Sequence, residues 1–260
     1  MTIATPTRPA RLIGGVNPLA KLGAALMIGI CLILSIDWVS ASVALALELV
    51  LFTVAGVSWR QFWQRTWPVW LAAPLAAVTI ALYGQTSGEV YFEFLLARVS
   101  DGSLELALAT ALRILAVALP AVVLFITVDP TDLADSLAQL LRLPARFVLG
   151  ALAALRLVGL FFDDWRSLEL ARRARGVGDR GRIRRLLGQA FALLVLSVRR
   201  GSKLATAMEA RGFGSTVTRT WARQAHFGWR DALVVLAGLA IGLLAVWASV
   251  ATGHWRFIAG

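Results

Sequence analysis

The chain has 260 residues, of which 58% are hydrophobic, and its mean hydropathy is +0.74. This composition is too apolar for a soluble globular domain and predicts an integral membrane protein. The formal net charge is +11. Basic membrane proteins carry such an excess in their cytoplasmic segments, so the charge indicates topology and we expect no nucleic-acid partner. Cys31 is the only cysteine, which excludes a disulfide or a Cys-based metal site within the chain.

Five apolar segments approach or reach the roughly 20 residues that a bilayer crossing requires. They cover residues 22–36, 39–57, 67–83, 104–128 and 231–250. We therefore predict an all-α integral membrane protein with about five transmembrane helices. Its three regions are residues 1–128 with four spans, residues 129–230 with long helices outside the bilayer core, and residues 231–260 with the fifth span and the C-terminal tail.

The charges of the connecting segments predict the orientation. The N-terminal tail carries Arg8, Arg11 and Lys21, and the link between the second and third spans carries Arg60 and Arg65. The other two links among the first four spans are mainly acidic. The positive-inside rule then places the N-terminus in the cytoplasm and, after five crossings, the C-terminus outside.

The block between the fourth and fifth spans begins with a helix signal, because Asp129 can cap a helix that has Pro130 at its first position. A second helix is expected from Pro144 and a third over residues 181–211. Their apolar runs, residues 147–162 and 186–198, look short for a bilayer crossing. Two interpretations stay open: a hairpin of two short spans, or helices at the cytoplasmic face. Residues 163–230 carry fifteen Arg and Lys, which favours the cytoplasmic placement.

A repeated ending marks these two long helices. "ARRARGVG" at Ala171–Gly178 and "AMEARGFG" at Ala207–Gly214 agree at five of eight positions, 36 residues apart. Glycine after the last helical turn is a common C-cap, and arginine there complements the helix dipole, so each copy alone reads as a helix stop. Capping does not require the same arginine twice. Two equivalent guanidinium tips suggest a partner with two equivalent acidic grooves.

These residues resemble the signature of the transmembrane T component of energy-coupling factor transporters, a family that includes the cobalt and biotin uptake versions. The resemblance rests on Ala174-Arg175-Gly176 and Ala210-Arg211-Gly212, with support from "NPLAKL" at Asn17–Leu22 and "DPTDLADSLAQLLRLP" at Asp129–Pro144. It covers nearly the whole chain.

The resemblance implies a non-enzymatic coupling subunit in the inner membrane of a bacterium or archaeon. Its partners would be two ABC-type ATPases, a substrate-binding S component for a vitamin or metal ion, and the lipid bilayer. By family analogy, Arg175 and Arg211 seat in the two ATPases. These hold ATP and Mg²⁺, so no cofactor, metal or catalytic residue is expected on this chain. A platform for the S component is expected where small residues leave the helix that begins at Pro144 smooth, at Gly150, Ala153, Ala154 and Gly159.

Two rival functions remain. The first is a lipid-binding or enzymatic membrane protein whose basic segment, residues 129–230, binds lipid headgroups. The second is a self-sufficient ABC permease with its own substrate site. Two charges within apolar spans, Glu48 and Arg113, are functional candidates by default. We favour structural pairing between them, or an Arg113 side chain that extends to the membrane interface.

Overall fold

The computed structural model describes residues 15–35, 37–84, 87–94, 97–176, 181–215, 220–253 and 255. The chain divides into two compact units. One consists mainly of Ala134–Ala225, and the other combines Arg8–Leu133 with His226–Gly260. We refer to the first as the coupling unit and to the second as the membrane unit.

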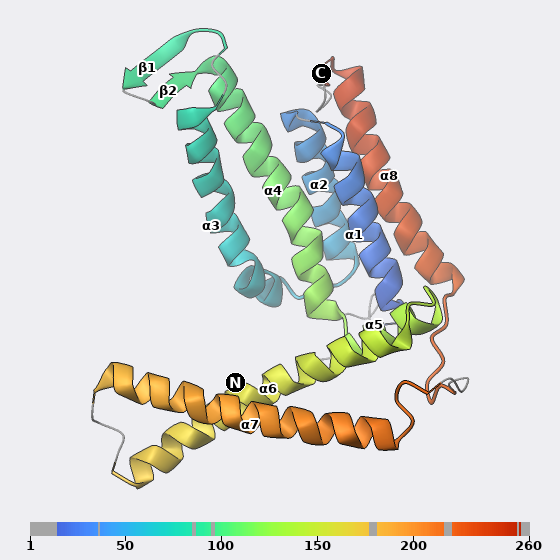
Figure 1. Ribbon diagram of the computed structural model, residues 1–260. Helices are drawn as coiled ribbons and strands as arrows, with labels where there is room; N and C mark the ends of the chain where they lie inside the picture. Colours follow the sequence, from blue (N-terminus) through green and yellow to red (C-terminus); the bar gives the residue numbers. More distant parts are fainter. Residues whose placement is uncertain are drawn as a thin grey trace. The chain divides into compact units, whose positions relative to one another are not determined.

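Five helices of the membrane unit match the five predicted spans (Figure 1). They are α1 (Pro18–Ile33), α2 (Trp38–Val54), α3 (Trp59–Tyr83), α4 (Asp101–Thr127) and α8 (Trp229–Ala251). By length and composition α3, α4 and α8 qualify as membrane spans, whereas α1 and α2 are shorter apolar helices. The predicted all-α membrane fold is confirmed.

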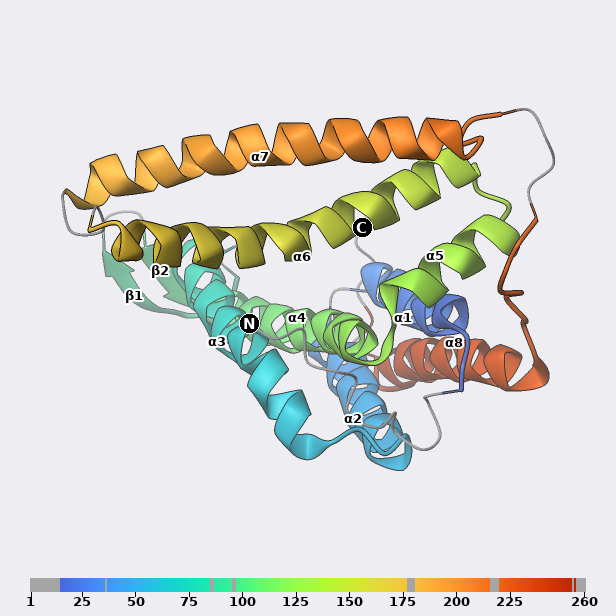
Figure 2. The same ribbon diagram turned by 90° about the horizontal axis from the view of Figure 1, so that it is seen from below.

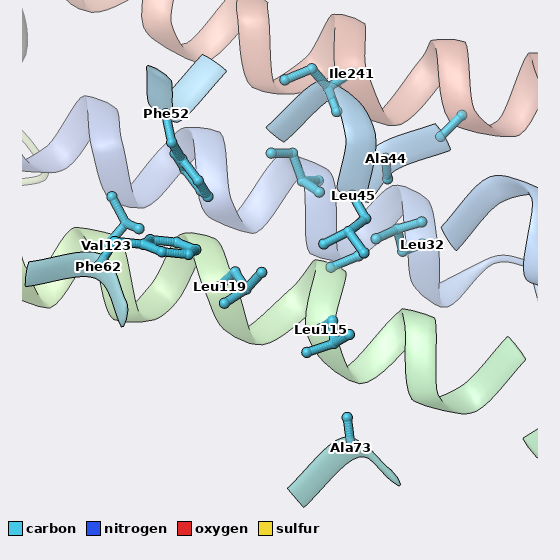
Figure 3. Packing of buried hydrophobic residues seen from close by; sticks show 13 residues of the cluster. Leu32, Ala44, Leu45, Phe52, Phe62, Ala73, Leu115, Leu119, Val123 and Ile241 are labelled. Carbon is cyan, nitrogen blue, oxygen red and sulfur yellow. The ribbon is translucent and has the colours of Figure 1, made fainter. Parts of the chain in front are cut away.

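The core of the membrane unit draws one or more side chains from each of these helices (Figure 3). Leu32 of α1, Phe62 of α3 and Leu119 of α4 are at most 1% exposed. Phe52 of α2 and Ile241 of α8 pack into the same cluster. Such mutual burial of apolar side chains makes the five helices one packed bundle.

Small residues bring α1 and α8 together. A Cβ atom placed on Gly238 would lie 2.7 Å from the backbone of Ala24, and one on Gly242 would lie 2.7 Å from the Cys31 side chain. Gly238 and Gly242 are four residues apart on one helix face, the spacing that permits close helix contact in membranes. The close approach of α1 to α8 therefore requires glycine at position 238, where the neighbouring atoms are backbone.

The link between α3 and α4 contains a hairpin that the charge-based interpretation did not predict. Strands β1 (Val90–Phe94) and β2 (Ala97–Ser100) pair antiparallel. The sequence "VYFEF" is rich in β-branched and aromatic residues, which favour a strand. Tyr91 donates its hydroxyl to Asp101 Oδ1 at 2.8 Å. This hydrogen bond to the carboxylate, together with its negative charge, raises the pKa of Tyr91.

The coupling unit contains most of α5 (Pro130–Gln139) and the whole of α6 (Ala145–Ala174) and α7 (Arg182–Ala210) (Figure 2). The predicted start of α5 is confirmed, because Asp129 Oδ1 accepts the backbone N–H of Thr131 at 2.7 Å. Further along, α5 and α6 share a small apolar cluster of Ala134, Ala138 and Val148.

Helix α6 corrects one step of the sequence argument. Its apolar run looked too short to cross a bilayer, but the helix continues for 30 residues and qualifies as a span by length and composition. The polar residues from Asp163 onward are part of the same uninterrupted helix, which adds length beyond the apolar run. Length therefore does not separate the two interpretations, and the cytoplasmic placement depends on the charge argument alone.

Twin Ala-Arg-Gly helix ends as the candidate functional site

The two repeated endings have the same backbone conformation. Arg175 follows the last residue of α6 with φ −88° and ψ 4°, and Arg211 follows the last residue of α7 with φ −91° and ψ 13°. The next residues, Gly176 and Gly212, have φ values of 67° and 79°. These left-handed angles are the ones that glycine adopts at a helix C-terminus without steric cost. The predicted C-caps are therefore confirmed at both sites.

Matching hydrogen bonds close the two ends. Gly176 N–H donates to the Arg173 carbonyl at 3.0 Å, and Gly212 N–H donates to the equivalent Glu209 carbonyl at 2.9 Å. Both arginine side chains are exposed. Among the described residues, none forms a hydrogen bond or ion pair with either guanidinium. Each tip thus presents a fixed backbone turn and an arginine whose five donors are available to a partner.

The two tips lie at opposite ends of an antiparallel pair, as Figures 1 and 2 show. At one end, Arg146 near the start of α6 donates to the carbonyl of Gly214, just past the end of α7, at 2.6 Å. At the other end, Arg172 lies against Gly188 near the start of α7. Because the helices run in opposite directions, their equivalent C-terminal ends are separated by about the length of one helix.

The electrostatics of the two tips differ. Arg172 and Arg173 precede the first tip, and Arg173 pairs with Glu169 at 2.6 Å across one helical turn. Met208 and Glu209 precede the second tip. The first tip is therefore more basic than the second, although the backbone geometry is the same.

The four residues expected to form a smooth platform do not share one helix face. Gly150, Ala153 and Ala154 are spaced by three and four residues along α6 and so lie on one side. Gly159 follows Gly150 by nine residues, or two and a half turns, which places it on the opposite side. A Cβ atom on Gly150 would meet nothing within 4 Å, so this face of the helix is open in the chain by itself.

The coupling unit exposes much of its apolar surface. Phe147, Leu155 and Phe162 of α6 are 77%, 60% and 65% exposed, and Phe191 of α7 is 68% exposed. Leu152 instead packs against Ala134 and Ala138 of α5. Exposed apolar side chains on this scale mark a surface that contacts protein or lipid.

The "NPLAKL" stretch, which the sequence only associated with a family, joins the ends of three helices. The Asn17 backbone N–H donates to Asp231 Oδ1 of α8 at 2.6 Å, and its side chain donates to the His226 carbonyl at 3.0 Å. Lys21 Nζ donates to the carbonyl of Thr127, the last residue of α4, at 3.1 Å. The contacting residues are more than 100 positions apart. The sequence signals that could have indicated them are the Asn-Pro helix start and the lysine at the beginning of an apolar segment.

The pairing expected between Glu48 and Arg113 does not form. Arg113 Nη1 donates to the carbonyl of Ser35 at 3.0 Å. Glu48 is fully buried, and among the described residues neither of its carboxyl oxygens has a hydrogen-bond partner. Arg113 donates a hydrogen bond to a carbonyl just past the end of α1, which explains its position structurally. The contacts of the described residues give no such explanation for Glu48.

Comparison with known proteins supports one family. The family model of the cobalt transport protein CbiQ matches residues 9–221. The energy-coupling factor transporter transmembrane protein EcfT of Brevibacillus brevis is 25% identical over 243 residues, which cover 89% of this chain and 91% of that protein. EcfT of Lactococcus lactis is 28% identical over 90% of this chain and 92% of its own length. EcfT of Bacillus selenitireducens is 31% identical over 59% of this chain and 62% of its own length.

The CbiQ match includes all of α1 to α7 and both Ala-Arg-Gly tips, well over half of the chain. The chain combines a bundle of apolar helices with a pair of long antiparallel helices, and both features agree with a membrane-embedded transport subunit. The chain therefore belongs to the CbiQ family and is a transmembrane T component of energy-coupling factor transporters.

Proposed function

We propose that this chain transmits ATP-driven motion from two ABC-type ATPases to a substrate-binding S component, and so drives uptake of a vitamin or a metal ion. One observation carries the proposal: two tips with the same backbone turn stand at opposite ends of one antiparallel helix pair. An antiparallel pair of equivalent helices has an approximate two-fold axis. Two similar ATPase subunits related by such an axis would each meet one tip.

The chemistry of the tips suits an acidic groove. A guanidinium can bind a carboxylate through two parallel hydrogen bonds, which fixes direction as well as position. The neighbouring Ala174 and Gly176, like Ala210 and Gly212, have no bulky side chain that would obstruct entry. In this proposal the chain binds no cofactor and has no catalytic residue, because ATP and Mg²⁺ are held by the ATPases.

The exposed apolar side chains of α6 and α7 suit the S component. Phe147, Leu155 and Phe162 would contact its membrane-embedded surface, and the open face at Gly150, Ala153 and Ala154 would permit close approach. In this proposal the same helices lie on the cytoplasmic side with the N-terminus, because exporting the fifteen Arg and Lys of residues 163–230 would oppose the positive-inside rule.

Arginine substitutions at the tips test this function. We expect Arg175→Ala and Arg211→Ala each to weaken co-purification of the ATPases and uptake of substrate, and the double variant to abolish both. A half-made buried charge pair costs about 3–5 kcal/mol, so each loss is measurable. Lysine is expected to rescue poorly, because it lacks the planar fork. Arg166→Ala is the matched control, since Arg166 is exposed on α6 but lies nine residues before the tip.

Three outcomes would contradict the proposal. If the double alanine variant retains its ATPases and transports normally, the repeated ending serves only as a pair of helix caps. If lysine replaces both arginines without loss, a headgroup-binding role fits better, because a point charge is then sufficient. Substrate binding by the purified chain alone would indicate a self-sufficient permease.

A further inference from the structure

The repeat extends far beyond the two tips. When α6 is aligned with α7 at the same 36-residue offset, identical residues recur along the whole length of the helices. The identical pairs before the tips are Arg146/Arg182, Ala154/Ala190, Leu157/Leu193, Leu160/Leu196, Leu168/Leu204 and Ala171/Ala207. At two places the copies have opposite charges: Asp163-Asp164 in α6 corresponds to Arg199-Arg200 in α7, and Arg173 corresponds to Glu209.

The structure brings one of these complementary positions into contact. Arg200 Nη1 lies 2.5 Å from Asp164 Oδ2, and Arg200 Nη2 lies 3.3 Å from Asp164 Oδ1. The carboxylate is therefore bound by both arms of the guanidinium. The Asp164 and Arg200 side chains are 18% and 34% exposed, so the ion pair is partly shielded from solvent between the helices.

The position of this pair within the repeat is informative. Asp164 lies eleven residues before Arg175, and Arg200 lies eleven residues before Arg211. When two equivalent helices are related by a two-fold axis, equivalent residues can meet only where that axis passes between them. The Asp164–Arg200 contact thus marks the axis. The helix arms from this contact to the two tips are equal, at about 16 Å each.

Opposite charges at this place avoid a repulsion between the two copies. A strict repeat would bring two aspartates or two arginines together, and like charges in contact repel. With an acid in one copy and a base in the other, the two helices attract each other at the axis. A partly exposed ion pair contributes little to stability, whereas its two-point geometry restricts how the helices slide and rotate.

We propose that the Asp164–Arg200 ion pair is the pivot of the coupling helices, a positioning contact that keeps the two arms equal while the tips move. The proposal depends on the coupling function proposed above. When the ATPases move both tips, a crossing point fixed by this ion pair gives equal and opposite displacements of the two helix arms. Without the ion pair, α6 can slide along α7, and part of the motion is lost before it reaches the S component.

Charge exchange provides the test, in the complete transporter complex in lipid nanodiscs. The variants are Asp164→Arg, Arg200→Asp and the double exchange, with Asp163→Arg, Arg199→Asp and their double exchange as matched controls one residue away on both helices. Spin labels at Ala171→Cys and Ala207→Cys, in a Cys31→Ser background, report the distribution of distances between the arms. Uptake per ATP hydrolysed reports coupling, and co-purified ATPase reports seating of the tips.

Each single exchange at the pivot should broaden the distance distribution and lower uptake per ATP by at least roughly threefold, the scale expected for two charges in direct contact. The double exchange should restore both, and the controls should change neither. ATPase co-purification should stay normal throughout. A distribution that stays narrow in the single variants, or a double exchange that rescues nothing, would overturn the pivot. Loss of ATPases from the Arg175 and Arg211 variants is measured separately, so the failure of either proposal is recognised independently.

Discussion

The backbone N–H of Asn17 donates to Oδ1 of Asp231 at 2.6 Å, and the other carboxyl oxygen of Asp231 accepts the Gly228 N–H at 2.7 Å. One buried carboxylate therefore caps α8 and holds the beginning of α1. The chain returns from the coupling unit to the membrane unit at residue 226, and Asn17 also binds the carbonyl of His226. This contact fastens α8 at the place where the chain re-enters the helix bundle.

Replacing Asp231 by alanine should destabilise the membrane unit. The change removes two charge-assisted hydrogen bonds and leaves the buried N–H of Asn17 and the partly buried N–H of Gly228 without this acceptor, at a cost of about 3 kcal/mol. Thermal unfolding in detergent, followed by tryptophan fluorescence, checks this. Asp231→Asn retains one acceptor oxygen and should lose about half as much stability. Equal stability of the alanine variant and the unmodified chain would show that the contact is energetically unimportant.

Replacing Gly238 by alanine should also destabilise the bundle. The new methyl group would lie 2.7 Å from the Ala24 backbone, so α1 and α8 would have to separate. Overpacking of this kind costs about 1–3 kcal/mol. Gly29→Ala on α1 is the control, because nothing lies within 4 Å of its added Cβ atom. The control should unfold at or slightly above the temperature of the unmodified chain, since alanine favours the helix. Identical behaviour of the two variants would contradict the close packing of α1 and α8.

Glu48 should be replaceable without loss of stability. Its two carboxyl oxygens are buried without a hydrogen-bond partner among the described residues, which is unfavourable by about 1–3 kcal/mol. Glu48→Met has a similar volume and removes the unpaired oxygens, so we expect equal or higher thermal stability. Glu48→Ala should lower it, because a cavity remains. If methionine is strongly destabilising, Glu48 binds a group contributed by water, lipid or another subunit.

Membrane orientation is predicted from charge and can be measured directly. Single cysteines at Asp179 and Gly260, both outside the described residues, should react with membrane-impermeant reagents from opposite sides. Position 179 should react only from the cytoplasm. Labelling of position 179 from outside would show that α6 and α7 form a membrane-spanning hairpin, which the length of α6 permits. The proposed contact of the tips with cytoplasmic ATPases would then be impossible.

Both helix tips could be recognised from sequence because their structure is local. Gly176 and Gly212 take left-handed angles for reasons that involve only the preceding turn, and Asp129 caps α5 through a residue two positions away. Helical periodicity places Gly159 on the opposite side of α6 from Gly150, which composition alone could not show, and the platform itself stays a prediction. The β1–β2 hairpin was missed because that link was judged by its charges alone.

Hydropathy, charge distribution and the repeated motif determined the membrane class, the order of the helices and the positions of both arginine tips. Those features depend on residues within a few positions of one another, or on sums over a segment. Tertiary structure alone decided which distant groups meet: Asn17 with Asp231, Arg113 with Ser35, and Asp164 with Arg200. A polar side chain in a bundle binds whichever group packing brings within about 3 Å, and packing depends on the shapes of all the helices together. For the same reason the Glu48 carboxyl group has no hydrogen-bond partner within the described part of the chain, although Arg113 offers a complementary charge in the sequence.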